Sequence, residues 1–241
     1  MSTLHSTPDA ATSQAAPPRD ARSFWRILLA VAAPIGPVAA ALADLIQPWK
    51  YSATPTDVVK QIAGHTGAET ATVWLHVVSA ALFIAGVIAV CWITRRRAPV
   101  LTAAGGVLSA FGILIQAQLP SLDLIALAGI NKGIDPGTLG TLLTAVNNHP
   151  VEALGIFAFL SHVAGQILLG TAIWRTRVAP WWLGLALLAS GPLQMAGGAT
   201  SSVPVAVAGW LLNAAGFLAA TLVLMHTPND QFDLPPVPKG A

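Results

Sequence analysis

The sequence predicts an all-α integral membrane protein: a bundle of six transmembrane helices with the N- and C-termini cytoplasmic. Its composition is the first reason. The 241 residues are 54% hydrophobic and 9% charged, with a mean hydropathy of +0.67, whereas a soluble domain carries about 25% charged residues. The second reason is that the apolar residues form runs of about 20, long enough to cross a bilayer as helices.

The six predicted spans and their loops form one transmembrane domain over residues 23–227. The spans lie at 24–46, 71–94, 99–119, 151–174, 181–199 and 203–226. The flanking segments 1–22 and 228–241 have tail-like compositions, rich in Ser, Thr, Ala and Pro, and are predicted to be disordered cytoplasmic tails. The first run ends in a motif like a signal-peptidase site. It is longer than a signal sequence requires and contains two prolines, so we expect a retained helix.

Short helices are predicted in two of the loops. Thr54 is placed as an N-cap before Pro55, and Gly64 as the end of that helix. In the longer loop between the third and fourth spans, 122–130 is apolar but too short to span, so an interfacial or re-entrant piece is expected. Residues 138–146 are predicted to form another short helix.

The distribution of basic residues predicts the orientation of the bundle. With the N-terminus cytoplasmic, the inner segments hold all the arginines: Arg19, Arg22, Arg26, Arg95, Arg96, Arg97, Arg175 and Arg177. The outer loops then hold only Lys50, Lys60 and Lys132. This asymmetry follows the positive-inside rule over every loop.

Each span carries a stripe of small or polar residues at i+3/i+4 spacing, which lies on one helix face. The stripes are consistent with a compact bundle held by interhelical hydrogen bonds. At a rise of about 1.5 Å per residue, however, the polar positions gather in the outer half. The inner half is almost wholly apolar. We therefore predict an outward-facing polar pocket, with these ligand candidates: Asp44, His76, Gln116, Glu152, His162, Gln166, Gln194 and Asn213.

Such a pocket favours a protein that binds or transports a small, partly apolar molecule. Two alternatives stay open. One is an intramembrane enzyme that uses a carboxylate/His acid–base pair, similar to an isoprenoid cyclase or a lipid-modifying enzyme. The other is a structural or accessory membrane protein without a ligand. The expected partners are membrane lipids and a lipid-like or small-molecule ligand, and no nucleic acid is expected at a net charge of +2.

No cofactor is predicted. Haem ligation by His76 and His162 would need both imidazoles at one iron, but their depths differ by on the order of 10 Å. A metal site from Asp44, His76, Glu152 and His162 has suitable ligand types without a recognisable spacing. The single cysteine, Cys91, excludes an intramolecular disulfide. The sequence contains no nucleotide-binding motif or nucleophile elbow.

Spans two and three resemble spans four and five, which suggests a duplicated hairpin. In each pair a helix with a histidine leads through an arginine-rich turn and a proline into a Gly-rich helix.

A further resemblance covers residues 155–198. It is carried by Gly155-Ile156-Phe157, His162, Leu169-Gly170, Ile173-Trp174-Arg175, Pro180 and Leu183-Gly184-Leu185. This region resembles a family of bacterial multi-pass membrane proteins of similar length and unassigned activity. The resemblance implies placement in a bacterial cell (plasma) membrane and implies no mechanism.

Overall fold

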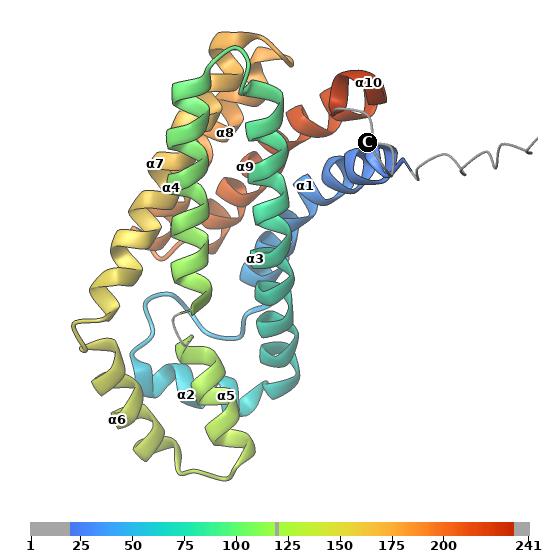
Figure 1. Cartoon of the computed structure of the whole chain (residues 1–241). Helices are drawn as coiled ribbons and strands as arrows, with labels where there is room; N and C mark the ends of the chain where they lie inside the picture. Colours follow the sequence, from blue (N-terminus) through green and yellow to red (C-terminus); the bar gives the residue numbers. More distant parts are fainter. Residues whose placement is uncertain (1–19, 119–120, 234–241) are drawn as a thin grey trace, which may run out of the picture.

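The computed structural model describes residues 20–118 and 121–233, and this part of the chain consists of helices joined by turns and loops, without strands (Figure 1). The helices are α1 (Arg22–Ile46), α2 (Pro55–Gly64), α3 (Thr66–Thr94), α4 (Pro99–Gln118), α5 (Leu122–Asn131), α6 (Pro136–Asn147), α7 (Glu152–Thr176), α8 (Trp181–Ala199), α9 (Val203–His226) and α10 (Asn229–Phe232). The all-α prediction is confirmed.

Five helical stretches are long and apolar enough to cross a membrane: α1, α3, α7, α9 and the stretch that begins with α4. The remaining predicted span is α8, a helix of 19 residues that contains Pro192. Glycine, serine, proline and glutamine interrupt its second half. It nevertheless packs between α7 and α9 as a member of the bundle.

Small residues bring the long helices into backbone contact. A Cβ on Gly36 of α1 would lie 2.6 Å from the backbone nitrogen of Phe83 in α3. A Cβ on Gly197 of α8 would lie 2.5 Å from the backbone nitrogen of Ala206 in α9. The predicted stripes of small residues therefore lie at helix crossings, where they allow close approach.

Helices α2, α5 and α6 pack on one another at one end of the bundle, a unit we call the cap (Figure 1). Its core contains Val59, Ile62, Leu139 and Leu143, all buried. Helices α2 and α6 correspond to the predicted short helices, and α5 occupies the apolar segment 122–130, for which the sequence predicts an interfacial or re-entrant piece. The Thr54 hydroxyl accepts a hydrogen bond from the Asp57 N–H at 3.3 Å, as expected of the N-cap.

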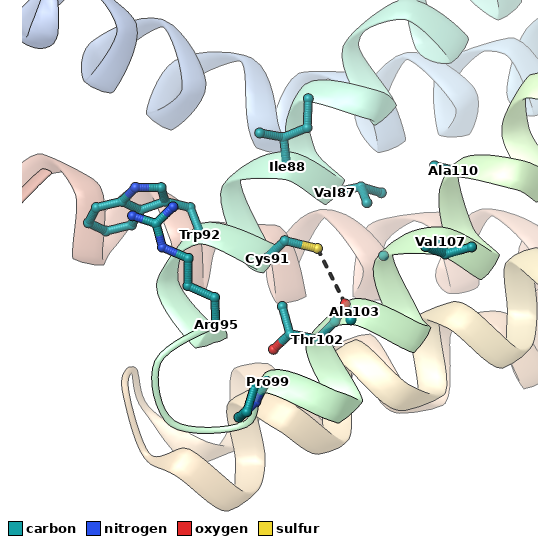
Figure 2. Close-up of a pocket in the computed structure, with 11 residues that line it drawn as sticks. Val87, Ile88, Cys91, Trp92, Arg95, Pro99, Thr102, Ala103, Val107 and Ala110 are labelled. Carbon is teal, nitrogen blue, oxygen red and sulfur yellow. Dashed lines mark hydrogen bonds between the residues drawn. The ribbon is translucent and has the colours of Figure 1, made fainter. Parts of the chain in front are cut away.

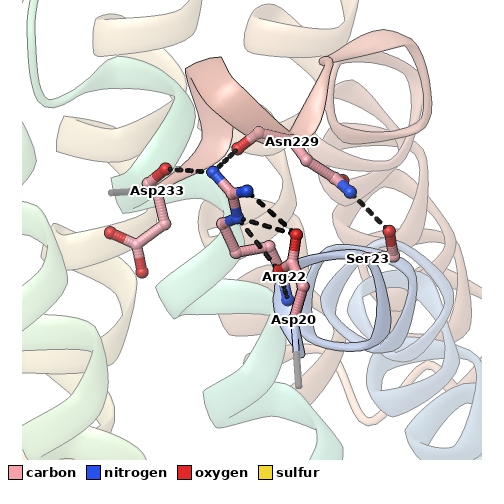
Figure 3. A network of polar contacts seen from close by, with 5 residues as sticks. All are labelled: Asp20, Arg22, Ser23, Asn229 and Asp233. Carbon is pink, nitrogen blue, oxygen red and sulfur yellow. Dashed lines mark hydrogen bonds and ion pairs between the residues drawn. The ribbon is translucent and has the colours of Figure 1, made fainter. Parts of the chain in front are cut away.

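The opposite end of the bundle, which we call the arginine end, carries Arg22, Arg26, Arg95, Arg96, Arg97, Arg175 and Arg177. Both ends of the described chain meet there (Figure 3). Arg22 donates hydrogen bonds to the carbonyl oxygens of Asn229 and Asp233 at 3.3 and 3.2 Å. The Asn229 amide donates to the Ser23 hydroxyl. Arg22 also holds the pKa of the Asp20 carboxyl below its usual value through a side-chain hydrogen bond.

The predicted disordered tail after residue 227 begins with an ordered segment. Residues 229–232 form α10, and Phe232 is buried with its ring centroid 5.0 Å from that of Trp92 on α3. The Phe232–Trp92 contact and the hydrogen bonds from Arg22 anchor this turn, and a composition-based prediction of disorder misses such contacts. Residues 1–19 and 234–241, the rest of both predicted tails, lie outside the described residues.

Helix α3 begins at Thr66, earlier than the predicted start of the second span at residue 71. Its first turns contain Glu69 and Thr72, which are both buried. These turns continue towards the cap, where polar residues are buried by protein. Helix α3 is therefore longer than the apolar run that predicted it.

Candidate functional site

Four helices bring polar side chains together in the interior of the bundle. Gln166 of α7 donates from Nε2 to the Ser109 hydroxyl of α4 at 3.1 Å. Asn213 of α9 donates from Nδ2 to Gln166 Oε1 at 3.2 Å and to the Ser190 hydroxyl of α8 at 3.3 Å. Ser190 donates in turn to the Leu187 carbonyl at 2.7 Å. All four side chains are buried, and we call them the interhelical network.

The network forms where glycines let these helices approach one another. A Cβ on Gly165 of α7 would lie 2.5 Å from the backbone nitrogen of Ser109. A Cβ on Gly209 of α9 would lie 2.7 Å from Gln194 Cγ. Side chains of ordinary size at these glycines would push the helices apart and separate the hydrogen-bonding groups.

A second set of buried polar atoms lies beside the network without hydrogen bonds. Both ring nitrogens of His162, both amide atoms of Gln194 and Oδ1 of Asn213 have no hydrogen-bond partner among the described residues. His162 is 1% exposed and Gln194 is 5% exposed. We call these atoms the unpartnered set. Buried polar groups are nearly always hydrogen-bonded, and an unpaired group costs about 1–3 kcal/mol.

The helix contacts place the three residues at neighbouring levels of the bundle. Gly191 of α8 faces Val163 of α7, the residue after His162. Gly209 of α9 faces Gln194, and Asn213 lies one turn further along α9. His162, Gln194 and Asn213 therefore lie within a few turns of one another on three helices, of which α8 packs against both α7 and α9.

Aromatic rings surround the imidazole. The centroid of the His162 ring lies 5.0 Å from that of Phe83 on α3 and 6.2 Å from that of Trp210 on α9. The Phe83 ring also packs against Phe217 at 5.0 Å. The surroundings of His162 are thus apolar and aromatic, and its nitrogens are the exceptional polar atoms there.

Trp210 links this interior to Asp44, near the end of α1. The Trp210 indole Nε1–H donates a hydrogen bond to Asp44 Oδ2 at 3.0 Å. The Tyr51 phenol and the His76 imidazole also interact with the Asp44 carboxylate. Burial, and after it the nearby Asp44 carboxylate, raise the pKa of the Tyr51 phenol above its usual value. Tyr51 therefore keeps its phenol proton beside the Asp44 carboxylate.

Five of the predicted ligand residues therefore lie in one region of the interior. His162, Gln166, Gln194 and Asn213 belong to the interhelical network or the unpartnered set, and Trp210 connects Asp44 to them. The side chains of His76 and Gln116 are exposed, although His76 interacts with Asp44. The side chain of Glu152 lies outside the described part of the structure. Neither ring nitrogen of His162 has a hydrogen-bond partner among the described residues, whereas the His76 imidazole interacts with the Asp44 carboxylate.

The sequence prediction missed Ser109, Ser190, Trp210 and Tyr51. Two of them had a recognisable signal. Ser109 lies between two glycines in the small-residue stripe of α4, and Ser190 precedes Gln194 by one turn on α8. Nothing in the spacing of Trp210 or Tyr51 indicates that their polar atoms face Asp44.

A separate buried carboxyl lies where α3 meets the cap. The Glu69 side chain is fully buried, and neither carboxyl oxygen has a hydrogen-bond partner in the described chain. The Asp123 carboxyl of α5 and the Trp49 indole are its polar neighbours. Within residues 20–118 and 121–233, no group of three or more His, Cys, Asp or Glu side chains is placed to hold a metal ion.

Towards the arginine end the interior becomes apolar. Ile173, Leu183, Leu187, Phe217 and Leu224 are buried in one hydrophobic cluster. A buried polar contact at this end is the hydrogen bond from the Thr102 hydroxyl to the Thr94 hydroxyl at 2.8 Å. The interhelical network, the unpartnered set and Asp44 therefore form a polar column on the cap side of this cluster.

No protein family, curated protein or solved structure matches this chain.

Proposed function

We propose that this chain is a six-span protein of the bacterial plasma membrane that binds a small, partly apolar molecule at His162, Gln194 and Asn213. The observation that carries the proposal is the unpartnered set: five buried side-chain nitrogens and oxygens on three adjoining helices without hydrogen-bond partners among the described residues. A bound molecule that supplies donors and acceptors would remove the penalty of leaving them unpaired.

The exposed surface supports the membrane placement. Large apolar side chains such as Val100, Val107, Ile156 and Phe157 are more than half exposed. In water such a surface would aggregate, whereas in a bilayer it contacts lipid tails. The arginine end is then expected on the cytoplasmic side under the positive-inside rule.

The position of the chain ends supports six spans. Both ends of the described chain meet at the arginine end through Arg22, Asn229 and Asp233. A chain that starts and finishes on the same side of a membrane crosses it an even number of times. Five apolar stretches therefore need one more crossing, and α8 supplies it because its backbone contacts both α7 and α9 closely.

The surroundings define the chemistry of the ligand. Phe83 and Trp210 offer ring faces beside His162, so the ligand needs an apolar, flat or aliphatic part. The His162 imidazole can donate or accept according to its tautomer, and Gln194 can do both. A carbonyl, hydroxyl or amide on an otherwise apolar molecule matches this set. The apolar cluster beyond the polar column favours binding over transport, because within the described chain its buried residues separate the polar column from the arginine end.

The test compares what copurifies with the wild-type protein and with a His162→Leu/Gln194→Leu variant. Each protein is purified into nanodiscs of one synthetic lipid, extracted with organic solvent and examined by mass spectrometry. We expect a small molecule at a fixed molar ratio in the wild type that is lost from the double variant. Ser161→Ala is the matched control, because Ser161 is buried next to His162 but its hydroxyl donates to the Phe157 carbonyl of its own helix.

Identical extracts from the wild type and the double variant would contradict the proposal. The double variant keeps the apolar surroundings of the site, so it is expected to fold, and its circular dichroism spectrum verifies this. Loss of the small molecule from Ser161→Ala as well would show that its retention depends on general packing rather than on the unpartnered set.

A further inference from the structure

A groove lies between α3 and α4, away from the polar column (Figure 2). Its volume is about 550 Å³, and apolar side chains dominate its lining. Ile88 of α3 and Val107 of α4 flank it, and both are exposed. Its lining contains no carboxylate. On the outer surface of a membrane bundle, this groove is open to lipid.

The groove exists because α3 and α4 diverge although a short turn joins them. Helix α4 directs Gly105 and Gly112 against α7, and it contacts α7 far more extensively than α3. Gly106 faces α3, where a Cβ would lie 2.6 Å from the Cys91 Sγ. The Cys91 thiol donates to the Thr102 carbonyl at 3.7 Å on the floor of the groove (Figure 2).

Cationic groups surround the end of the groove at the arginine end. The Arg95 guanidinium lies 5.0 Å from the ring centroid of Trp92, and both residues line the groove. A second depression of about 360 Å³ adjoins it at Pro99 and is lined by Arg97 and Arg175. Arg97 uses one of its N–H groups on the Thr176 carbonyl at 3.1 Å, and a guanidinium has further N–H groups to offer an anion.

We propose that this groove binds an anionic phospholipid of the surrounding bilayer, with one acyl chain between α3 and α4 and its phosphate at Arg95 and Arg97. Charge complementarity selects this occupant. Lipid tails are as apolar as the groove, so any acyl chain can fill it without preference. An arginine near the membrane surface favours an anionic lipid by about 1 kcal/mol, or roughly fivefold. Trp92 beside Arg95 is the type of side chain that resides at the interface.

This proposal rests on the membrane placement alone and is independent of any ligand at His162. The groove lies between α3 and α4, whereas His162, Gln194 and Asn213 belong to α7, α8 and α9 and are absent from the groove lining. A result at one site therefore leaves the other unaffected.

The test is native mass spectrometry of the purified full-length protein, titrated with phosphatidylglycerol and, separately, with phosphatidylcholine. We expect one phosphatidylglycerol to bind preferentially. The Arg95→Gln/Arg97→Gln variant should bind it about 25-fold more weakly, at roughly fivefold per arginine, and should keep the wild-type affinity for phosphatidylcholine. Arg177→Gln is the matched control, because Arg177 lies at the same end outside both depressions.

A second variant tests the acyl-chain part of the site. Ala103 lines the groove and is exposed, so Ala103→Phe should occupy the groove, leave the fold unchanged and prevent the preferential binding. Ala110→Leu serves the same purpose if Ala103→Phe does not fold. Equal affinities for the two lipids, or full phosphatidylglycerol affinity in the Arg95→Gln/Arg97→Gln variant, would overturn the proposal. Full affinity for phosphatidylglycerol in the groove variants would also overturn the proposal. A wild-type dimer that disappears in the groove variants would overturn it too, because a second copy of the chain would then occupy the groove.

Discussion

The α3–α4 and α7–α8 hairpins share a sequence pattern but pack in different ways. In the second hairpin the glycines face each other: a Cβ on Gly170 would lie 2.7 Å from the Gly184 carbonyl oxygen, and a Cβ on Gly184 would lie 2.6 Å from the Trp174 nitrogen. In the first hairpin the glycines of α4 face mainly α7, and a groove separates it from α3. A stripe of small residues therefore gives close packing only where its partner presents a matching face.

The strongest test of this difference is to fill the close contact of the second hairpin. Gly184→Leu places a side chain against the α7 backbone, and overpacking of this kind should cost about 3 kcal/mol or more, with loss of folded protein. SDS titration followed by circular dichroism measures the effect. Gly198→Leu, near the end of the same helix, should be tolerated because a Cβ there meets nothing within 4 Å. Equal losses in both variants would mean that glycine content, not the helix contact, sets stability.

The next largest effect is expected from the interhelical network that joins the second hairpin to α4 and α9. Gln166→Leu removes its hydrogen bonds to Ser109 and Asn213. Interhelical hydrogen bonds in membranes contribute about 0.6 kcal/mol on average, so a loss of about 1 kcal/mol is expected in the same titration. A stability equal to that of the Ser161→Ala control would show that the network does not hold these helices together.

The two histidines of the repeated pattern sharpen the comparison further. His162 is buried without hydrogen bonds among the described residues, whereas His76 is exposed. In ligand-stripped protein, His162→Leu should leave stability unchanged or raise it by up to about 1 kcal/mol, because the cost of an unpaired polar group disappears. His76→Leu should change it by less than about 0.5 kcal/mol. A clear loss in His162→Leu would assign the imidazole a structural hydrogen bond.

The smallest effect is expected in the groove of the first hairpin. Ala103→Phe, like Gly184→Leu, introduces a large side chain. At position 103, however, the new side chain points into the open groove between α3 and α4. Its free energy of unfolding should stay within about 0.5 kcal/mol of the wild type. Destabilisation comparable to Gly184→Leu would show that the first hairpin closes as tightly as the second.

Much of this architecture follows from the sequence because it depends on local patterns. The apolar runs predict the long helices, and Thr54 with Pro55 predicts the start of α2. The interior position of Gln166 and Asn213 follows from polar residues within apolar helices. What depends on helix rotation does not follow: a stripe shows which face is small but not which neighbour it meets. A stripe also does not show where along the helix its neighbour ends: Ser109 and Gln116 share one face of α4, but Ser109 bonds to Gln166, whereas Gln116, predicted to line the pocket, is exposed near the end of the helix.

The contact between the two chain ends has a mechanical consequence. Arg22 joins the start of α1 to α10, and Arg26 donates to the Thr227 carbonyl at 2.5 Å. A force applied to the two ends would therefore load neighbouring, antiparallel helices at one end and peel α1 from α9 turn by turn. The α7–α8 hairpin, which lies outside this path, should resist until the terminal pair has separated. Single-molecule pulling from the ends would show this order as an early low-force step followed by a later, higher one.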